Sequence, residues 1–178
     1  MKVHALTYWL TGFSGAGKTV LAQALVQQLQ AAGQAACVLD GDELRSGLCS
    51  DLGFSAADRE ENMRRTAHLA HLLNRQGIHV IAALISPTIA GRSAAQQTIS
   101  PECFVEIHVS TPLEICQQRD PKGLYARARH DSTLGLTGLQ APYEAPVQPA
   151  LRINTHETPL ADAVRQILSI QSLRHSTP

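Results

Sequence analysis

The sequence predicts an α/β protein of three layers, in which a central parallel sheet of five strands carries helices on both faces. The first observation is that apolar runs rich in β-branched residues alternate with helical patterns along the chain, which is typical of a buried parallel sheet. The second is a glycine-rich segment, residues 12–19, that lies directly between an apolar run and a helical pattern. With 178 residues the chain can bury a substantial core, and we expect one domain over residues 1–178.

Each expected strand is a short apolar run that ends at a polar or turn residue. Runs of about four to eight such residues indicate strands rather than helices. The strands are expected at residues 4–11, 35–40, 79–85, 104–110 and 151–154.

The expected helices show apolar residues at spacings of three and four, the period of one helix face. Ser55 stands three residues before Asp58, the spacing of a capping box, and Thr111 stands three residues before Glu114 in the same way. Gly33 follows the first helical pattern, where a left-handed residue is favoured. The helices are expected at residues 18–32, 42–48, 57–76, 89–99, 112–119 and 159–171, with a short one near residues 125–129.

One segment departs from this alternation. Residues 121–149 hold four prolines and three glycines and show little apolar periodicity. A stretch of this length with so little regular structure is usually functional or disordered. We predict that it is a lid that closes over a bound nucleotide; the alternative is an ordinary surface excursion. The tail, residues 173–178, is expected to be frayed.

Composition excludes several classes of protein. The formal net charge is +0, which argues against a nucleic-acid binder that depends on bulk charge. No apolar run approaches the length of a membrane span, and the first strand begins so early that we expect no cleaved signal and a cytoplasmic location. The four cysteines are widely spaced and predict buried thiols rather than disulfides or zinc ligands; they are Cys37, Cys49, Cys103 and Cys116.

The glycine-rich segment has the complete pattern G-x-x-x-x-G-K-[ST] of a phosphate-binding loop. Its members are Gly12, Phe13, Ser14, Gly15, Ala16, Gly17, Lys18 and Thr19. Glycines let successive backbone N–H groups point at phosphate oxygens, and the helix that follows directs the positive end of its dipole at the same point. Lys18 supplies a charge for the phosphates, and the Thr19 hydroxyl is placed to ligate Mg²⁺. We interpret the segment as a nucleoside triphosphate site, with a plain glycine-rich turn as the alternative.

Two carboxylates follow the second expected strand. Ligands of an open parallel sheet bind beyond the carboxyl ends of its strands, so Asp40 and Asp42 are expected beside the phosphate-binding loop. We assign Asp40 to chemistry and Asp42 mainly to capping the next helix. The third strand ends at Ser86, where many phosphate-loop proteins carry a magnesium-binding Asp, and this makes Asp40 the candidate for both metal and base.

Five arginines near strand ends and helix starts are candidates for holding a second, phosphate-bearing substrate, because the guanidinium group offers a bidentate fork. They are Arg45, Arg59, Arg64, Arg65 and Arg92. Each could equally be a solvated surface residue.

These residues belong to longer runs that resemble one family. The chain resembles adenylylsulfate kinase (APS kinase) over nearly its whole length, in the runs G-F-S-G-A-G-K-T, L-D-G-D-E-L-R, G-F-S-A-A-D-R-E-E-N, I-S-P, T-P-L-E-I-C-Q-Q-R-D-P-K-G-L-Y and T-G-L-Q-A-P-Y-E-A-P. They stand at residues 12–19, 39–45, 53–62, 85–87, 111–125 and 137–146. The resemblance implies a three-layer P-loop kinase fold with a lid in its C-terminal half.

The same resemblance implies the reaction. Family members transfer the γ-phosphoryl group of ATP, with Mg²⁺, to the 3′-hydroxyl of adenosine 5′-phosphosulfate (APS), which gives 3′-phosphoadenosine 5′-phosphosulfate and ADP in sulfate activation. It also implies a homodimer and a functional link to an ATP sulfurylase, with neither nucleic acid nor membrane as partner.

Carried over position by position, the resemblance implies catalytic roles for Asp40, which would orient or deprotonate the acceptor hydroxyl, and for Lys18, Ser86 and Lys122. Ser86 matches a position described as a phosphoserine intermediate in bacterial members, whereas direct in-line transfer requires none. ATP is expected at residues 12–19 and Arg119, and Mg²⁺ at Thr19 and Asp40. The acceptor is expected at Asp42, Arg45, Phe54, Arg59, Asn62, Ile85, Ser86, Pro87, Lys122, Gly123, Leu124 and Leu136.

Four positions depart from the family pattern, and all lie on the acceptor side. Thr88 and Ile89 replace a Tyr-Arg or Tyr-small pair, while Leu134 and Leu136 replace a lysine and an aromatic residue that would stack opposite Phe54. Two alternatives therefore stay open: a family member with a different nucleotide acceptor, and a nucleotide-binding regulatory module without turnover.

Overall fold

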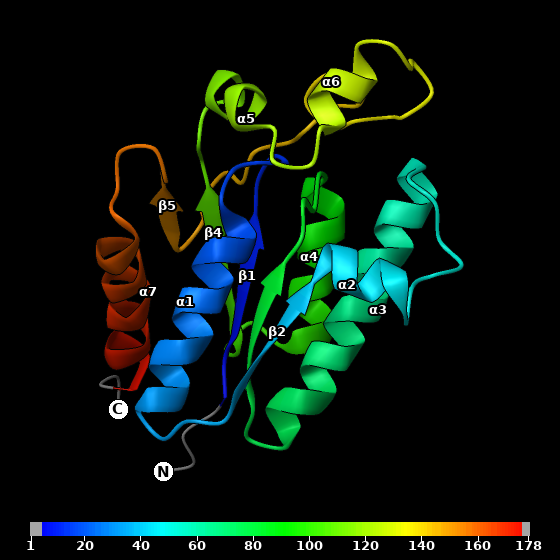
Figure 1. The fold of residues 1–178 in the computed structure, drawn as a ribbon. Coiled ribbons are helices and arrows are strands. Elements are labelled where there is room, and N and C mark those ends of the chain that lie inside the picture. The colour runs from blue at the N-terminus through cyan, green and yellow to red at the C-terminus, as the bar shows by residue number, and fades with distance from the viewer. Residues whose placement is uncertain (1–4, 176–178) are drawn as a thin grey trace.

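The computed structural model describes the backbone of residues 5–175 and the side chains of residues 5–171, and the expected parallel sheet is confirmed. The strands lie in the order β2–β3–β1–β4–β5, and each neighbouring pair is parallel. All carboxyl ends therefore meet at one edge, the upper one in Figure 1. The bounds are Thr7–Thr11 (β1), Ala36–Asp40 (β2), His79–Ala83 (β3), Phe104–Val109 (β4) and Leu151–Ile153 (β5).

Helices cover both faces of the sheet, as predicted. On one face lie α1 (Lys18–Ala31) and α7 (Leu160–His175); on the other lie α2 (Gly41–Ser46), α3 (Ala56–Arg75) and α4 (Ile89–Ile99). Two short helices, α5 (Leu113–Arg119) and α6 (Leu124–Ala128), stand beyond the carboxyl ends of the strands (Figure 1).

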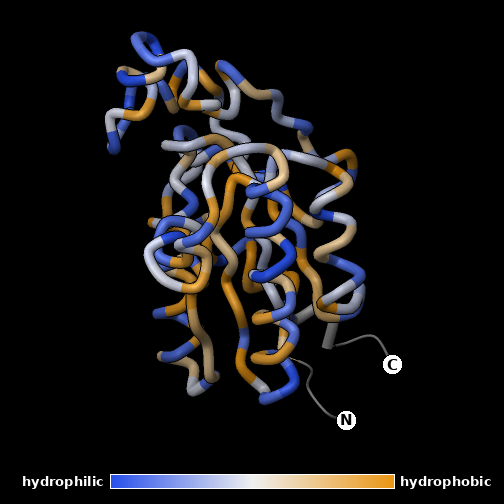
Figure 2. The backbone as a smooth tube through the Cα atoms, turned by 90° about the vertical axis from the view of Figure 1, so that its right-hand side faces the viewer, coloured by the Kyte–Doolittle hydropathy of each residue, from blue (hydrophilic) through white to orange (hydrophobic). Residues whose placement is uncertain are grey.

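The core consists of two layers that the central strand separates. Tyr8 and Leu10 point from β1 toward α1 and α7, whereas Trp9 between them points toward α3 and α4, and all three side chains are fully buried. The alternation follows from the pleat of a strand, which sends successive side chains to opposite faces. In Figure 2 the orange, hydrophobic runs lie along the strands through the centre of the molecule.

Local boundary signals were right at two places. The hydroxyl of Ser55 accepts a 3.1 Å hydrogen bond from the Asp58 amide, and the Asp58 carboxylate accepts from the Ser55 amide at 3.3 Å, so the capping box is present. Gly33 ends α1 at a φ of 76°, a left-handed conformation that glycine adopts without steric cost.

Two capping predictions were wrong. The cap of α2 is Asp40, whose Oδ1 accepts from the Asp42 amide at 2.9 Å, because the helix begins one residue earlier than expected, at Gly41. Thr111 does not cap α5; its hydroxyl donates instead to the carbonyl of Ala16 at 3.0 Å, inside the phosphate-binding loop.

The segment expected to be a lid, residues 121–149, contains α6 and one isolated bridge, Thr137–Ala141, before the chain enters β5. At the other end, α7 runs to His175, beyond its expected end at residue 171. Of the tail expected to be frayed, residues 173–178, residues 173–175 thus belong to α7, and residues 176–178 lie outside the described residues. Buried thiols are confirmed at Cys49 and Cys116, while Cys37 and Cys103 are half-buried. No helix in the described part of the chain combines the length and the apolar content needed to cross a membrane.

Candidate functional site

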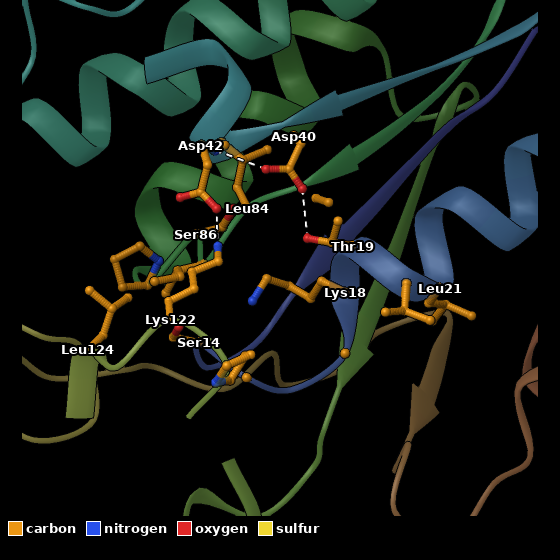
Figure 3. A pocket seen from close by; sticks show the side chains of 18 of the residues that line it. Ser14, Lys18, Thr19, Leu21, Asp40, Asp42, Leu84, Ser86, Lys122 and Leu124 are labelled. Carbon is orange, nitrogen blue, oxygen red and sulfur yellow. Dashed lines mark hydrogen bonds and ion pairs between the residues drawn. The ribbon is translucent and has the colours of Figure 1, made fainter. Parts of the chain in front are cut away.

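A cavity of about 820 Å³ opens at the carboxyl ends of the strands, where ligands of parallel sheets bind. The phosphate-binding loop forms one wall, and the segments around Phe54 and Ser86 form another. Lys122, at the start of the lid segment, reaches toward Asp42 (Figure 3). Most of the expected site residues line it: Ser14, Gly15, Gly17, Lys18, Thr19, Asp40, Asp42, Arg45, Phe54, Arg59, Asn62, Ile85, Ser86, Pro87, Arg119, Lys122, Leu124 and Leu136. Gly12, Phe13, Ala16 and Gly123 are not among its lining residues.

The loop is built around glycines that no other residue could replace. Gly12 and Gly15 have φ angles of 151° and 75°, and a Cβ atom on either would lie 2.4 Å from the carbonyl oxygen of Val109 or 2.9 Å from that of Cys116. The backbone therefore curls tightly against β4 and α5, and α1 begins immediately after Gly17.

Lys18 is folded back onto this loop. Its Nζ donates to the carbonyl oxygens of Gly12 and Phe13, at 2.9 and 2.7 Å. Burial, followed by the charge of nearby Lys122, lowers the pKa of Lys18 to about 8. An anion beside the amine would reverse that shift, since an opposite charge favours the charged form.

Thr19 and Asp40 join the two sides of the cavity. The Thr19 hydroxyl donates to Asp40 Oδ2 at 2.7 Å, and the other carboxylate oxygen caps α2 (Figure 3). A hydroxyl and a carboxylate are both hard oxygen donors of the kind that Mg²⁺ takes, usually with phosphate oxygens and waters as its remaining ligands. The pair therefore fits the magnesium ion that kinases use.

Asp42 does not cap α2; its carboxylate instead forms an ion pair with Lys122 across the mouth of the cavity (Figure 3). The Lys122 side chain is 48% exposed and that of Asp42 is 65% exposed, so the pair contributes little to stability. Its effect is to hold the ammonium group at the start of the lid segment over the cavity that Lys18 and Thr19 also line.

An aromatic surface and two guanidinium groups form the far side. The Phe54 ring is 55% exposed and lies 4.7 Å from the Arg45 guanidinium and 5.6 Å from that of Arg59. Arg59 also donates to the carbonyl of Gly135 at 2.9 Å, which ties the lid segment to this surface. Nearby, Asn62 is 3% exposed and, within the described residues, its Nδ2 has no hydrogen-bond partner. A planar, anionic ligand would satisfy all of these groups.

The chain matches the family model for adenylylsulphate kinase over residues 4–154. It belongs to the adenylylsulphate kinase family. It is 52% identical over 161 residues to the adenylyl-sulfate kinase of Paraburkholderia xenovorans (strain LB400), covering 90% of this chain and 89% of that protein. It is 49% identical to the adenylyl-sulfate kinase of Shewanella sp. (strain ANA-3), covering 90% and 78%.

Solved structures of APS kinases have the same fold. The Mycobacterium tuberculosis APS kinase CysC, in complex with AMPPNP and APS, superposes with a TM-score of 0.90 at 40% identity, over 95% of this chain and 98% of that chain. The hexameric APS kinase from Thiobacillus denitrificans superposes with a TM-score of 0.72 at 32% identity, over 98% of this chain and 30% of that chain. The three-layer P-loop kinase fold expected from the sequence is thus confirmed.

The five candidate arginines of this family member divide into two groups. Arg45 and Arg59 line the cavity. Arg64 and Arg65 do not; both pair with Glu61, and Arg65 also pairs with Asp51. Arg92 does not line the cavity either, and the residue is 2% exposed.

Ser86 occupies an unusual place in the kinase. It has a φ of 48° and is 2% exposed, and its hydroxyl accepts a 2.9 Å hydrogen bond from the indole nitrogen of Trp9. Non-glycine residues adopt such a backbone conformation only where surrounding contacts hold it. The turn therefore has a fixed shape.

Sequence reasoning missed Thr155. Its hydroxyl donates to the Ala16 carbonyl at 2.8 Å, and Arg119 donates to both its hydroxyl, at 2.8 Å, and its carbonyl, at 3.2 Å. Thr111 contacts the same hydroxyl at 2.9 Å. These contacts hold the loop and Arg119 in one arrangement. The available signal was the position of Thr155 just after β5, at the edge of the sheet where Asp40 ends β2.

Proposed function

We propose that this family member transfers the γ-phosphoryl group of ATP to the 3′-hydroxyl of APS. The observation that supports this proposal most directly is the 2.7 Å hydrogen bond between Thr19, on the phosphate-binding loop, and Asp40, on the acceptor side. Residues of both sides line one cavity, and this hydrogen bond brings the two sides into contact, which is what transfer between two bound nucleotides requires.

On the donor side, the loop amides, Lys18 and Arg119 bind the phosphates of ATP. Lys18 exchanges its hydrogen bonds with the loop carbonyls for phosphate oxygens, and Lys122 approaches the transferring group from the lid segment. These charges act where negative charge is spread in the transition state. Thr19 and Asp40 hold Mg²⁺, which when bound neutralises the charge of the β- and γ-phosphates.

On the acceptor side, Phe54 stacks on the adenine of APS while Arg45 and Arg59 hold its anionic groups. The Asn62 amide, which lacks a protein partner among the described residues, donates to the same nucleotide. Asp40 accepts the hydrogen bond of the ribose hydroxyl and aligns it for in-line attack. The lid, residues 121–149, excludes water, so that phosphoryl transfer prevails over hydrolysis.

A second candidate, a different nucleotide acceptor, is favoured by one observation. Leu134 and Leu136 supply aliphatic surface to the acceptor side of the cavity, and Leu136 is 4% exposed and packed into the core. The base of an acceptor nucleotide would then contact the Phe54 ring on one side and aliphatic side chains, Leu134 and Leu136, elsewhere on the acceptor side.

The decisive experiment measures ADP release from MgATP with APS and, separately, with other nucleotides as acceptor. Stimulation by APS is the expected result. Stimulation by another nucleotide alone would establish the second candidate, and binding without turnover of any acceptor would identify a regulatory module. The formation of 3′-phosphoadenosine 5′-phosphosulfate, followed by chromatography, confirms the position of transfer.

The proposal also covers assembly and context. We propose a single cytoplasmic domain that forms a homodimer and uses APS supplied by an ATP sulfurylase. Self-association is supported by the relative from Thiobacillus denitrificans, which is described as hexameric. Light scattering of the purified protein tests it, and a monomer at micromolar concentration would contradict the dimer.

A further inference from the structure

Arg92 joins three segments that are distant in the sequence. It lies in the first turn of α4 and is 2% exposed. Its Nε pairs with Glu106 Oε1 on β4 at 2.8 Å; Nη1 donates to the Ser86 carbonyl at 2.7 Å, and Nη2 donates to the Glu144 carbonyl at 2.7 Å. The planar guanidinium thus uses its rigid fork in three directions at once.

The first of these carbonyls belongs to the wall of the cavity. Ile85, Ser86 and Pro87 line the cavity on the acceptor side, and Ser86 holds its positive φ of 48°. Besides Arg92, the Ser86 carbonyl accepts from the Thr11 hydroxyl, at the longer distance of 3.2 Å. Of the two hydrogen bonds that hold the Ser86 carbonyl in place, the one from Arg92 is therefore the shorter.

The second carbonyl lies where the lid segment rejoins the body of the protein. The Glu144 amide donates to the Pro87 carbonyl at 2.8 Å, and its carboxylate accepts from the Ile89 amide at 2.7 Å. Next to it, the Tyr143 hydroxyl contacts that of Thr11 at 2.9 Å. The cavity wall at residues 85–87 and the root of the lid at Glu144 are thus bonded directly to each other, and we call this contact the joint. Arg92 donates one hydrogen bond to each of its two sides.

We propose that Arg92 is a positioning residue for the acceptor: it fixes the cavity wall at residues 85–87 and the root of the lid at Glu144 as one unit. This rests on the function proposed above. Because Arg92 does not line the cavity, it acts on the bound nucleotide through its contacts with Ser86, with Glu144 and with the neighbouring Tyr143 ring, whose centroid lies 6.0 Å from the guanidinium carbon. The donor half-site uses neither Ser86 nor Glu144, so loss of Arg92 impairs acceptor use and spares ATP binding.

The test is Arg92→Met, compared with Arg92→Lys, which keeps the charge but loses the fork. We expect Arg92→Met to raise the KM for APS by about 10- to 100-fold, since small misplacements of a bound substrate have effects of this size. The KM for ATP should stay within about 3-fold, and Arg92→Lys should fall between the wild type and Arg92→Met. Equal changes in both KM values would overturn the proposal.

Hydrogen exchange gives a second readout that requires no substrate. The amides of Ile89 and Glu144 bond across the joint, so Arg92→Met should speed their exchange while the amides of β1 and β3 keep wild-type protection. Uniformly faster exchange would show a purely structural role and overturn the proposal. If Arg92→Met does not fold, the same measurements on Arg92→Lys decide.

Two controls isolate the carbonyl contacts. Arg65→Met removes another multiply bonded arginine, on α3 and away from the cavity, and should leave both KM values unchanged. Arg92→Met combined with Glu106→Gln removes the carboxylate that the single variant leaves unpaired. If the double variant recovers the wild-type KM for APS, the defect of Arg92→Met came from the unpaired Glu106 carboxylate, and the proposal fails.

The two proposals fail in distinguishable ways. If the wild type does not use APS, the proposed function is wrong, and the exchange measurement alone then decides whether Arg92 holds the joint. If the wild type uses APS and Arg92→Met keeps its KM, the proposed function stands and the role of Arg92 is overturned.

Discussion

Thr19 and Asp40 are hydrogen-bonded to each other, with 2.7 Å between the hydroxyl and carboxylate oxygens. Thr19 lies in the first turn of α1, directly after the phosphate-binding loop, and Asp40 ends β2 and caps α2. The contact therefore fixes the distance between the donor and acceptor half-sites before either nucleotide binds. Asp40 therefore has two roles: it caps α2, and it is proposed to align the acceptor hydroxyl. A test of the second role needs a substitution that keeps the first.

Asp40→Asn separates them. Asparagine caps a helix as well as aspartate does, so the thermal unfolding midpoint should stay within a few degrees of the wild type. Loss of the carboxylate should lower kcat by about 10²- to 10⁴-fold, the usual range for a positioned general base, with ATP affinity within a few-fold. Asp40→Ala should lose the cap as well, at about 1 kcal/mol of stability. Wild-type kcat in Asp40→Asn would show that Asp40 does not orient the acceptor.

Phe54→Leu tests the aromatic surface. A base that loses a stacked ring loses about 1–3 kcal/mol, so the KM for the acceptor should rise by about 5- to 150-fold while the KM for ATP stays constant. The ring is 55% exposed, so stability should change by no more than about 0.5 kcal/mol. Leu72→Ala, at an apolar side chain on α3 that is 58% exposed and does not line the cavity, is the matched control. Equal effects of the two substitutions would contradict the stacking role.

Lys18 gives ATP binding a proton linkage. Its pKa is lowered to about 8 in the free protein, mainly by burial and then by Lys122, and bound phosphates should raise it again. Binding at pH 9 should therefore take up close to one proton, whereas binding at pH 7 should take up almost none, and affinity should fall as the pH rises through 8. Calorimetry in buffers with different ionisation enthalpies measures the uptake. The same uptake in Lys18→Arg, which does not titrate in this range, would assign the proton to another group.

His108 should make the protein sensitive to acid. Burial, followed by the charges of Arg152 and Arg92, lowers the pKa of His108 to about 4. Between that pKa and the ordinary value near 6.5, the unfolded chain binds a proton that the folded chain does not, so stability falls as the pH falls. Protonation also ends the 3.1 Å hydrogen bond that His108 Nδ1 accepts from Arg152, which itself bonds to the carbonyls of Pro146 and Val147.

We expect His108→Asn to be less stable than the wild type at pH 7 but to lose less stability on acidification. The difference in unfolding free energy between the two proteins should narrow by at most about 1.4 kcal/mol per pH unit below pH 6.5. Urea unfolding at several pH values between 7 and 4.5 measures it. A difference that is independent of pH would rule out His108 as the responsible group.

The elements of the fold could be predicted because their signals are local. The capping box at Ser55 and Asp58 and the left-handed Gly33 each involve residues within a few positions of one another. The cap of α2 could not be decided locally, since Asp40 and Asp42 both suit that role. What decides it is the pairing of Asp40 with Ala83 in the sheet, which keeps residue 40 extended and lets the helix begin immediately after it.

The site was predictable to the same extent. The phosphate-binding loop is a contiguous pattern, and the sheet topology places Asp40 beside it. By contrast, Thr155 contacts Ala16 across 139 positions of sequence, and Arg92 bonds to Glu144 across 52. Arg92 also looked like Arg45 and Arg59, as a basic residue near a strand end. Only the burial of Arg92 and its hydrogen bonds to Glu106, Ser86 and Glu144 show that it binds other parts of the protein and does not face the cavity.

The joint between the cavity wall and the lid has an evolutionary consequence, because it is made largely from main-chain groups. Arg92 bonds to the carbonyls of Ser86 and Glu144, and Ile89 contributes its amide to the Glu144 carboxylate while its side chain is 45% exposed. Any substitution at residue 89 except proline, which lacks the amide hydrogen, therefore leaves the joint intact, and a library of such variants should retain folding. Ile89 does not line the cavity, so residue 89 can vary in sequence directly after the cavity wall at residues 85–87 without that wall being rebuilt.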